Sequence, residues 1–463
     1  MAGVLGRSEA RVASDRGTRT GIASKRCADG RDAYLVNLAT RSARPAKSRR
    51  PGHERILRVP RLRWGVDSAT VPIIASVWLM GCLLAIVMLT PYSGDDVINK
   101  NIRENVHAVG KTLPGSMNDQ IVWWMTHEGR FFPGSVVWTE SVFWVFGSRV
   151  AYKLVIGLVL IGAIAGFGLF VSRLTGRLKA GVVYSTIVFG LIQFRTPYDG
   201  VISFAGLLPL TAGLSIAAVV ILISRRGIGW ATLAALSYSL ALVTYETVFL
   251  FAPTMVAVVV WVRRTWRPAL AIAIPALVQL GIVAILRLWL HAPTAPGYTM
   301  NIEPKAILFT FSKQVLAAFP LSQWAFSVDA VPTITAGAIG AGVLVAGVPT
   351  FLALAFLGRS QILANRTEAI VIGVFGAWMW LSSSALISIT RRWQVELHRG
   401  QGYLSVVYGY FGLALCLLSA YLLVDRIVAN RSSRLMAIWR FASALLISVT
   451  VSLTLAGNVS IFR

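Results

Sequence analysis

Apolar runs of about twenty residues, separated by short polar segments, make up most of the chain after residue 70. A helix of about 20 residues crosses a hydrocarbon core about 30 Å thick, so runs of this length predict membrane-spanning helices. The predicted fold class is therefore all-α, a polytopic transmembrane helical bundle. We count eleven spans, which are Val71–Thr90, Ala151–Val171, Ala180–Phe194, Val201–Ile223, Trp230–Tyr245, Thr247–Val262, Ala269–Leu290, Thr333–Leu357, Ala369–Ile389, Leu404–Val424 and Leu435–Gly457.

Two of these divisions follow from length and charge. Trp230–Val262 is an almost unbroken apolar stretch, and a single helix of that length would measure about 50 Å, which exceeds the hydrocarbon core. The basic clusters at 225–226 and 263–264 favour the same side of the membrane, which requires a hairpin at 245–246. The same reasoning divides the preceding stretch at 195–200, where a proline and a glycine supply the turn.

The composition agrees with this pattern. The chain is 56% hydrophobic and only 14% charged, far too apolar for a soluble surface. Most Lys and Arg residues of the short loops fall on one side, and the positive-inside rule makes that side cytoplasmic. We therefore expect a multi-pass protein of the cytoplasmic (inner) membrane, with the N-terminus in the cytoplasm and the C-terminus outside.

The domain organisation follows from the same distribution of charge. Residues 1–66 contain 16 Lys and Arg against 5 Asp and Glu and show no apolar periodicity, which predicts a disordered basic cytoplasmic tail. Residues 67–463 form the predicted membrane domain. Only six residues follow the last apolar run, so we expect no soluble carbohydrate-binding domain there.

Two external loops, at about 91–150 and 291–332, are much longer than the others. Long loops in membrane proteins are often functional. Aromatic and polar residues alternate through 121–133, 136–146 and Phe309–Phe326, a pattern typical of helices that lie at a membrane interface. The alternative is that these helices only cap the bundle.

Several kinds of chemistry find no support in the sequence. The three cysteines are far apart, no GxxxxGK[ST] loop occurs, and the five histidines show no paired spacing. A disulfide framework, ATP-driven chemistry and a histidine metal site are therefore not indicated. The net charge of +25 lies at membrane edges and in the tail, and we expect no nucleic-acid partner.

Asp95 and Asp96 directly follow the first span on a short Ser-Gly lead. A carboxylate at the outer membrane boundary is suited to act as a general base for a sugar hydroxyl. We expect both side chains at the water boundary rather than in a packed interior; the alternative is a solvated pair without function. These two residues are also the only metal candidates, and a divalent cation, Mg or Mn, remains open. No other cofactor is indicated.

The external arginines are candidate phosphate ligands, because a guanidinium can bind two phosphate oxygens. Arg391 and Arg392 lie at the outer end of a span, against the positive-inside trend, and favour a bound anion. The alternative is a salt bridge to Glu396 or to another external acid. Arg195 is a further candidate, and Arg287 a weaker one.

Two external acids lie at predicted turns. Glu246 is at the tip of the 245–246 hairpin, where an interface or helix-capping role is the alternative to a functional one. Asp199, in the turn before the fourth span, is expected to form that turn.

The order of these motifs resembles bacterial membrane glycosyltransferases of the C-type (GT-C) superfamily. The resemblance covers about residues 71–457. It rests on the acidic pair after the first span, Glu128-Gly-Arg-Phe-Phe-Pro-Gly134 in the first loop, Thr244-Tyr-Glu-Thr247 at the hairpin, Arg391-Arg-Trp-Gln394, Gly402-Tyr-Leu-Ser405 and Tyr410-Phe-Gly412.

Such enzymes move a sugar from a polyprenyl-phosphate carrier on the outer face to a glycan, lipid or protein acceptor, usually with inversion. The resemblance thus implies a hexosyl- or pentosyltransferase of cell-envelope polysaccharide biosynthesis. A lipid-borne donor is also consistent with the residues themselves, because nucleotide sugars are cytosolic and the candidate groups are external. The implied roles are Asp95 or Asp96 as base, Arg391, Arg392 and Arg195 at the donor phosphate, and Glu128, Arg130 and Glu246 on the acceptor side.

Other functions remain open. A polysaccharide polymerase or ligase would use the same lipid-linked sugars, with its long external loop expected in the later half of the chain. A flippase or secondary transporter of glycan precursors would be expected to show internal repeats and ionisable residues near mid-membrane. The sequence shows no repeat, and its charges lie almost wholly at helix ends.

Overall fold

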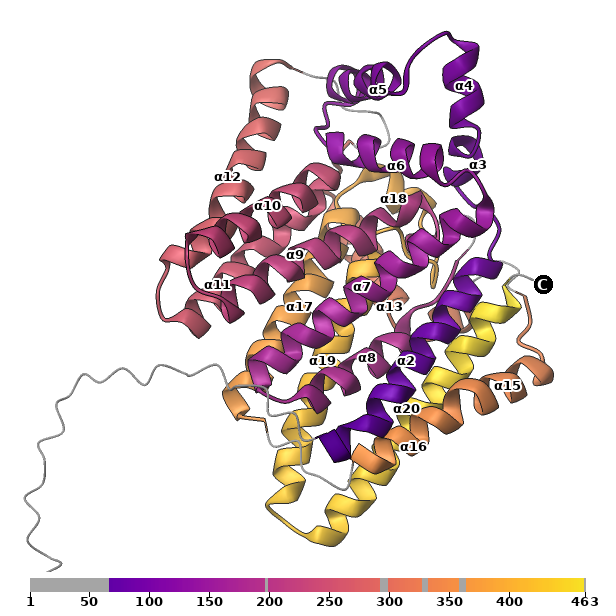
Figure 1. Cartoon of the computed structure of the whole chain (residues 1–463), viewed down its shortest axis with the longest axis vertical. Helices are drawn as coiled ribbons and strands as arrows, with labels where there is room; N and C mark the ends of the chain where they lie inside the picture. Colours follow the sequence, from indigo (N-terminus) through magenta and orange to yellow (C-terminus); the bar gives the residue numbers. More distant parts are fainter. Residues whose placement is uncertain (1–65, 196–198, 292–298, 327–331, 358–363, 462–463) are drawn as a thin grey trace, which may run out of the picture. The chain divides into compact units, whose positions relative to one another are not determined.

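The structure is a computed structural model that describes residues 66–195, 199–291, 299–326, 332–357 and 364–461. The described residues form helices and connecting segments without a strand, which confirms the predicted all-α fold class (Figure 1). The predicted basic tail lies outside the described residues, apart from Val66, which begins the first helix.

Nine helices in the described part of the chain are long and apolar enough to cross a membrane, and two shorter apolar helices accompany them. Each of the eleven predicted spans coincides with one of these helices. In chain order they are α2 (Val66–Leu89), α7 (Arg149–Thr175), α8 (Leu178–Leu191), η1 with α9 (Phe204–Gly206, Leu207–Ser224), α10 (Ile228–Thr244), η2 with α11 (Glu246–Phe251, Ala252–Arg263), η3 with α12 and η4 (Arg267–Ala269, Leu270–Ala284, Ile285–Trp289), α15 with η6 and α16 (Ala336–Gly342, Val343–Gly347, Val348–Leu357), α17 (Arg366–Ser388), α19 (Val406–Ala429) and α20 (Ser433–Ser460).

Both predicted divisions of the long apolar stretches are confirmed. Helix α10 ends at Thr244, and Tyr245 is extended, with φ −154° and ψ 107°. The 3₁₀ segment η2 then begins at Glu246 and leads into α11. Likewise α8 ends at Leu191 and the next helical segment starts at Phe204; residues 196–198 of the predicted turn lie outside the described residues.

Shorter helices occupy the predicted long loops. The first loop contains α3 (Asp96–Asn99), α4 (Ile102–Ala108), α5 (Leu113–His127) and α6 (Pro133–Val145), which gather at the top of Figure 1. Helix α5 has no buried residue, and Trp123 on it is 45% exposed, as expected of an interfacial helix. The second loop contains α13 (Pro304–Ala317) and α14 (Ser322–Phe326), while α18 (Arg391–Glu396) follows α17. Residues 292–298 and 327–331 of the second loop are outside the description.

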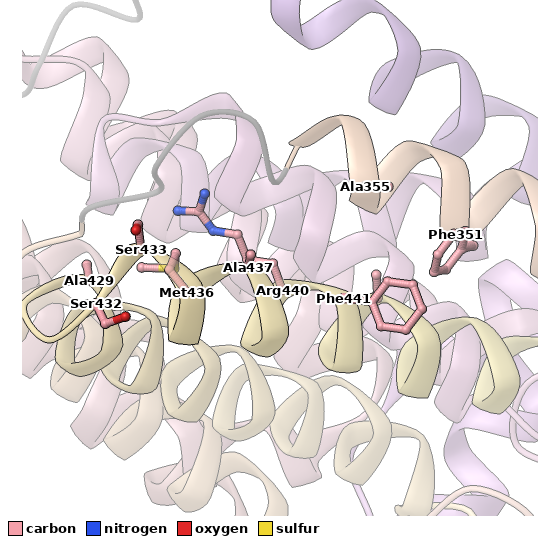
Figure 2. Close-up of a pocket in the computed structure, with 10 residues that line it drawn as sticks. Phe351, Ala355, Ala429, Ser432, Ser433, Met436, Ala437, Arg440 and Phe441 are labelled. Atoms are coloured by element: carbon pink, nitrogen blue, oxygen red, sulfur yellow. The ribbon is translucent and has the colours of Figure 1, made fainter.

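Two hollows open between spanning helices. One, of about 520 Å³, lies between α16 and α20, with Phe351 on one wall and Arg440 and Phe441 on the other (Figure 2). The second, of about 620 Å³, is apolar and lies among α2, α15 and α20, beside Trp78. None of the external candidate residues lines either hollow.

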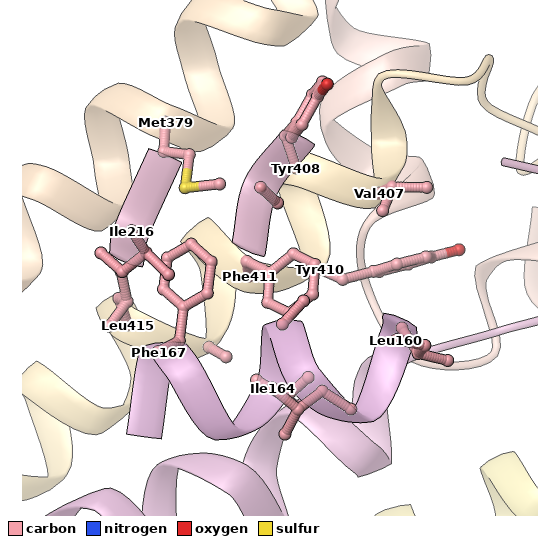
Figure 3. Packing of buried hydrophobic residues seen from close by; sticks show 14 of the residues in the cluster. Leu160, Ile164, Phe167, Ile216, Met379, Val407, Tyr408, Tyr410, Phe411 and Leu415 are labelled. Atoms are coloured by element: carbon pink, nitrogen blue, oxygen red, sulfur yellow. The ribbon is translucent and has the colours of Figure 1, made fainter. Parts of the chain in front are cut away.

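The core lies where α7, α9, α17 and α19 meet (Figure 3). Phe167 of α7 stacks on Phe411 of α19 with ring centroids 4.8 Å apart. Helices α17 and α19 approach closely because Gly376 faces Gly412: a Cβ on Gly376 would lie 2.5 Å from the Gly412 carbonyl oxygen. Small residues at such crossings let helix backbones approach within a membrane. This packing positions the ends of α7, α9 and α19 around the candidate site.

Candidate functional site

Asp96, the first residue of α3, is fully buried. The expectation that both acids lie at the water boundary is therefore wrong for Asp96 and correct for Asp95, which is exposed. The reason is local geometry. Gly94 adopts φ 58° and turns the chain into α3, and neighbouring residues of a helix point about 100° apart. One carboxylate consequently faces the bundle while the other faces outward.

Three groups surround the Asp96 carboxylate. The Lys153 Nζ atom of α7 lies 3.8 Å from Asp96 Oδ2, and the Tyr152 hydroxyl is hydrogen-bonded to the carboxylate. The backbone N–H of Ala205 points at Asp96 Oδ1, 3.4 Å away, and at the Tyr152 hydroxyl, 3.1 Å away. Asp96 Oδ2 accepts no hydrogen bond from any described residue. The Lys153 ammonium is therefore the charged group that this oxygen faces.

Burial raises the pKa of Asp96 from its usual value to about 6. The Tyr152 hydrogen bond, the Lys153 charge and the backbone donors of the 204–205 segment lower the pKa and offset part of this effect. A carboxylate whose pKa lies near the working pH is better suited to general-base catalysis than one near 4. Asp96 rather than Asp95 thus has the environment of a base.

Lys153 is fixed by the segment that precedes η1. Its ammonium group donates to the Ile202 carbonyl oxygen over 2.6 Å. The Asp199 carboxylate shapes that segment, since it accepts the N–H groups of Val201 and Ile202 at 2.6 and 2.8 Å and also that of Arg195. The prediction that Asp199 forms the turn is confirmed.

The segment ends in a left-handed turn. Phe204, Ala205 and Gly206 have φ of 56°, 50° and 67°. Each non-glycine residue in this conformation costs roughly 1–2 kcal/mol, so the surrounding contacts must hold the turn. One such contact comes from the first loop, where the indole N–H of Trp138 on α6 donates to the Ala205 carbonyl oxygen over 2.8 Å. The turn therefore connects α6 of the first loop to Asp96 on α3.

Arg195 does not reach the surface. Its side chain is buried, and each of its three guanidinium nitrogens donates to the protein: Nε to the Tyr410 hydroxyl (3.1 Å), Nη1 to the Gly400 carbonyl oxygen (2.6 Å) and Nη2 to the Ala317 carbonyl oxygen (2.5 Å). A phosphate would have to displace these bonds. Through these hydrogen bonds Arg195 links the segment after α8 to α13 and α19. The arrangement therefore does not favour the predicted phosphate role.

Arg391 and Arg392 lie on the short helix α18. Arg391 is exposed, and its backbone N–H donates to the Thr299 carbonyl oxygen over 2.9 Å. Arg392 forms an ion pair of 2.8 Å with Glu396, the alternative that the sequence left open, and its guanidinium lies 4.9 Å from the Trp393 ring centroid. Of the two, Arg391 is the more accessible to an anion.

The three predicted acceptor-side residues gather at one place. Arg130 and Glu246 form a partly buried ion pair with 2.6 Å between Nη2 and Oε1. The Arg130 guanidinium also lies 4.4 Å from the Phe132 ring centroid. Glu128 joins the cluster through its carbonyl oxygen, which accepts from Arg287 over 3.1 Å. The first loop, the 245–246 hairpin and η4 therefore meet here, and the acceptor role of these residues stays a prediction.

Sequence reasoning missed Tyr152, Lys153, Trp138 and Glu140. A lysine within an apolar run was the available signal for Lys153, because an ionisable residue in a span needs a partner. Glu140 on α6 is only 2% exposed, and its carboxylate accepts no hydrogen bond of ordinary geometry from the described residues. Burial raises the pKa of Glu140 to about 7, partly offset by the nearby Ser116 hydroxyl. No sequence signal separated Glu140 from the other loop acids.

A divalent cation bridging Asp95 and Asp96 does not fit this arrangement. The two carboxylates face different surroundings, and Lys153 already provides the positive charge beside Asp96. Among the residues that the structure describes, no three His, Cys, Asp or Glu side chains gather in one place.

No family model matches the chain, and no curated protein matches it. Among solved structures, the chain is similar to ArnT from Cupriavidus metallidurans, whose crystal structure was determined bound to undecaprenyl phosphate. The two share 12% sequence identity at a TM-score of 0.38, over 84% of this chain and 77% of that one.

Proposed function

We propose that this protein is a membrane glycosyltransferase that transfers a sugar from a polyprenyl-phosphate-linked donor to a glycan, lipid or protein acceptor of the cell envelope. The observation that carries the proposal is Asp96, a buried carboxylate at the start of the first long loop, whose Oδ2 accepts no hydrogen bond from the described residues and whose pKa is raised to about 6. The order of the sequence motifs resembling the GT-C superfamily supports the donor class.

In the proposed reaction, the hydroxyl oxygen of the acceptor bonds to the anomeric carbon of the sugar, and Asp96 Oδ2 takes the proton of that hydroxyl group. The bond between the anomeric carbon and the phosphate oxygen breaks, and polyprenyl phosphate leaves with the electron pair. Attack opposite the leaving group inverts the anomeric centre. The neighbouring ammonium of Lys153 favours the ionised carboxylate that the first step requires.

The remaining groups have proposed roles on either side of this reaction. Arg391, exposed on α18, would bind the donor phosphate and stabilise the charge that develops on it, and Arg392 would contribute while paired to Glu396. The cluster of Glu128, Arg130 and Glu246 would contact the acceptor. By the positive-inside rule this chemistry would take place on the outer face of the cytoplasmic membrane.

The direct test compares surface glycans and polyprenyl-phosphate sugars by mass spectrometry in cells without the gene, complemented by either the wild-type chain or Asp96→Asn. We expect deletion to remove one sugar from a glycan while its lipid-linked donor accumulates, and Asp96→Asn to fail to restore it. Unchanged glycans with confirmed expression of the wild-type chain would contradict the proposal. Full restoration by Asp96→Asn would instead contradict the role of Asp96 as the base.

A further inference from the structure

The peptide of Ala205 is held from two sides. Its N–H points inward to Asp96 Oδ1 and the Tyr152 hydroxyl, at 3.4 and 3.1 Å. Its carbonyl oxygen points to α6, where the Trp138 indole N–H donates to it over 2.8 Å. One residue thus connects a side chain of the first loop to the carboxylate of the candidate base.

The conformation of this peptide is not one that the sequence favours. Phe204 and Ala205 both have positive φ, and of the three residues of the turn only Gly206 adopts the left-handed region without strain. A residue that relaxed to negative φ would redirect its N–H. The contact between the Ala205 N–H and Asp96 therefore depends on the interactions that hold the turn left-handed. One of these is the hydrogen bond from Trp138, which lies on α6, outside the spanning helices.

Helix α6, which carries Trp138, is packed against the bundle at both ends. Gly134, in its first turn, packs against the end of α10 so closely that a Cβ there would lie 2.7 Å from Thr244 Oγ1. At the other end, Val142 and Phe143 are buried in the core. The Trp138 ring is therefore presented from a helix anchored on both sides of it.

We propose that Trp138 is a positioning residue for Asp96: its indole N–H holds the left-handed turn at 204–206 so that the Ala205 N–H faces the carboxylate. The consequence for catalysis rests on the proposed function, whereas the effect on the Asp96 carboxyl group does not. Three other charged or titratable groups lie around this carboxylate, namely Lys153 and Tyr152 of α7 and Tyr92 beside α3. Two more charges affect these neighbours: Asp199 interacts with Lys153, and Arg149 interacts with both Lys153 and Tyr92.

The test follows the protonation of Asp96 in the full-length protein by infrared spectroscopy in membranes, with Asp96→Asn used to assign the carboxyl band. Trp138→Phe keeps the ring and removes the N–H. The Ala205 N–H stabilises the ionised carboxylate, so its loss should raise the protonation midpoint by about half a pH unit. Trp144→Phe is the matched control, since Trp144 lies on the same helix but contacts Arg103 and His107.

A rescue separates the hydrogen bond from general packing. Ala205→Gly lets position 205 adopt positive φ without strain, so adding it to Trp138→Phe should return the midpoint toward the wild-type value. An unchanged midpoint in Trp138→Phe, an equal shift in Trp144→Phe or a failed rescue would overturn the proposal. If Trp138→Phe shifts the midpoint while Asp96→Asn retains sugar transfer, Trp138 still positions the Asp96 carboxylate, but the proposed role of Asp96 as the base fails. If no sugar transfer is detected with the wild-type protein, the proposed function fails while the effect of Trp138 on the midpoint stands.

Discussion

The Asp96–Lys153 pair and the Arg392–Glu396 pair show two ways in which a chain brings opposite charges together. Asp96 and Lys153 come from a loop helix and a spanning helix, and both side chains are fully buried. Arg392 and Glu396 lie one turn apart on α18, with side chains 39% and 52% exposed. Exposed pairs of this kind contribute about 0–1 kcal/mol, whereas breaking a buried pair costs several kcal/mol. The buried pair should therefore govern both function and folding.

The largest expected effect is at Asp96. Asp96→Asn should lower the rate of sugar transfer by about 10²–10⁴-fold, the range for loss of a general acid or base, while Asp95→Asn changes it little because Asp95 is exposed. The wild-type rate should fall as the pH drops through about 6, where the Asp96 carboxylate becomes protonated. Transfer to the acceptor in membrane vesicles, measured from pH 5 to 8, tests both. Equal losses in the two variants would refute the distinction.

The next largest effect is expected at Lys153. Lys153→Met should destabilise the protein by on the order of 3 kcal/mol at neutral pH, because it leaves the Asp96 charge buried without its cation. Thermal unfolding in detergent measures this as a lower midpoint. The double variant Lys153→Met/Asp96→Asn serves as control. It should recover much of the lost stability, since no unpaired charge remains. If stability does not recover, Lys153 acts mainly through packing.

A smaller effect is expected at Glu140. Because the folded-state pKa is raised to about 7, the ionised form is penalised in the native protein, so this penalty is present above pH 7 and disappears as the pH falls toward the unfolded-state value. The change in the free energy of unfolding caused by Glu140→Gln should therefore be more stabilising at pH 8 than at pH 5, by on the order of 2 kcal/mol. Unfolding midpoints at both pH values test this, and a pH-independent difference would contradict it.

The smallest effects on stability belong to α18. Arg392→Ala and Glu396→Ala should each change the free energy of unfolding by less than about 1 kcal/mol. Arg391→Ala should leave stability unchanged and weaken donor binding by about tenfold through loss of a charge-assisted contact. Binding of a synthetic polyprenyl-phosphate sugar measures this. Unaltered affinity in both arginine variants would remove α18 from the phosphate site.

The candidate site was only partly predictable. Asp96 was recognisable because an acidic pair ends the first apolar run, and Glu128, Arg130 and Glu246 because they occur in polar-aromatic motifs. Their meeting was not predictable, since the first loop and the hairpin are more than a hundred residues apart. The burial of Arg195 was not predicted, because a turn between two spans usually faces water. Here α13 and α19 cover the turn and accept hydrogen bonds from the Arg195 guanidinium.

The sequence by itself determined the eleven apolar helices, the two places where long apolar stretches divide and the helical character of the long loops, while several helix ends differ by two to five residues from the predicted ones. These features depend on local hydrophobicity, on helix length relative to the membrane and on turn residues, all of which act over a few neighbouring positions. Only the tertiary structure decided which acid of the pair is buried, which cation faces it and that a left-handed turn anchored by Trp138 presents a backbone N–H to it. The physical reason is that burial and electrostatic pairing depend on how distant helices pack, which no local pattern records.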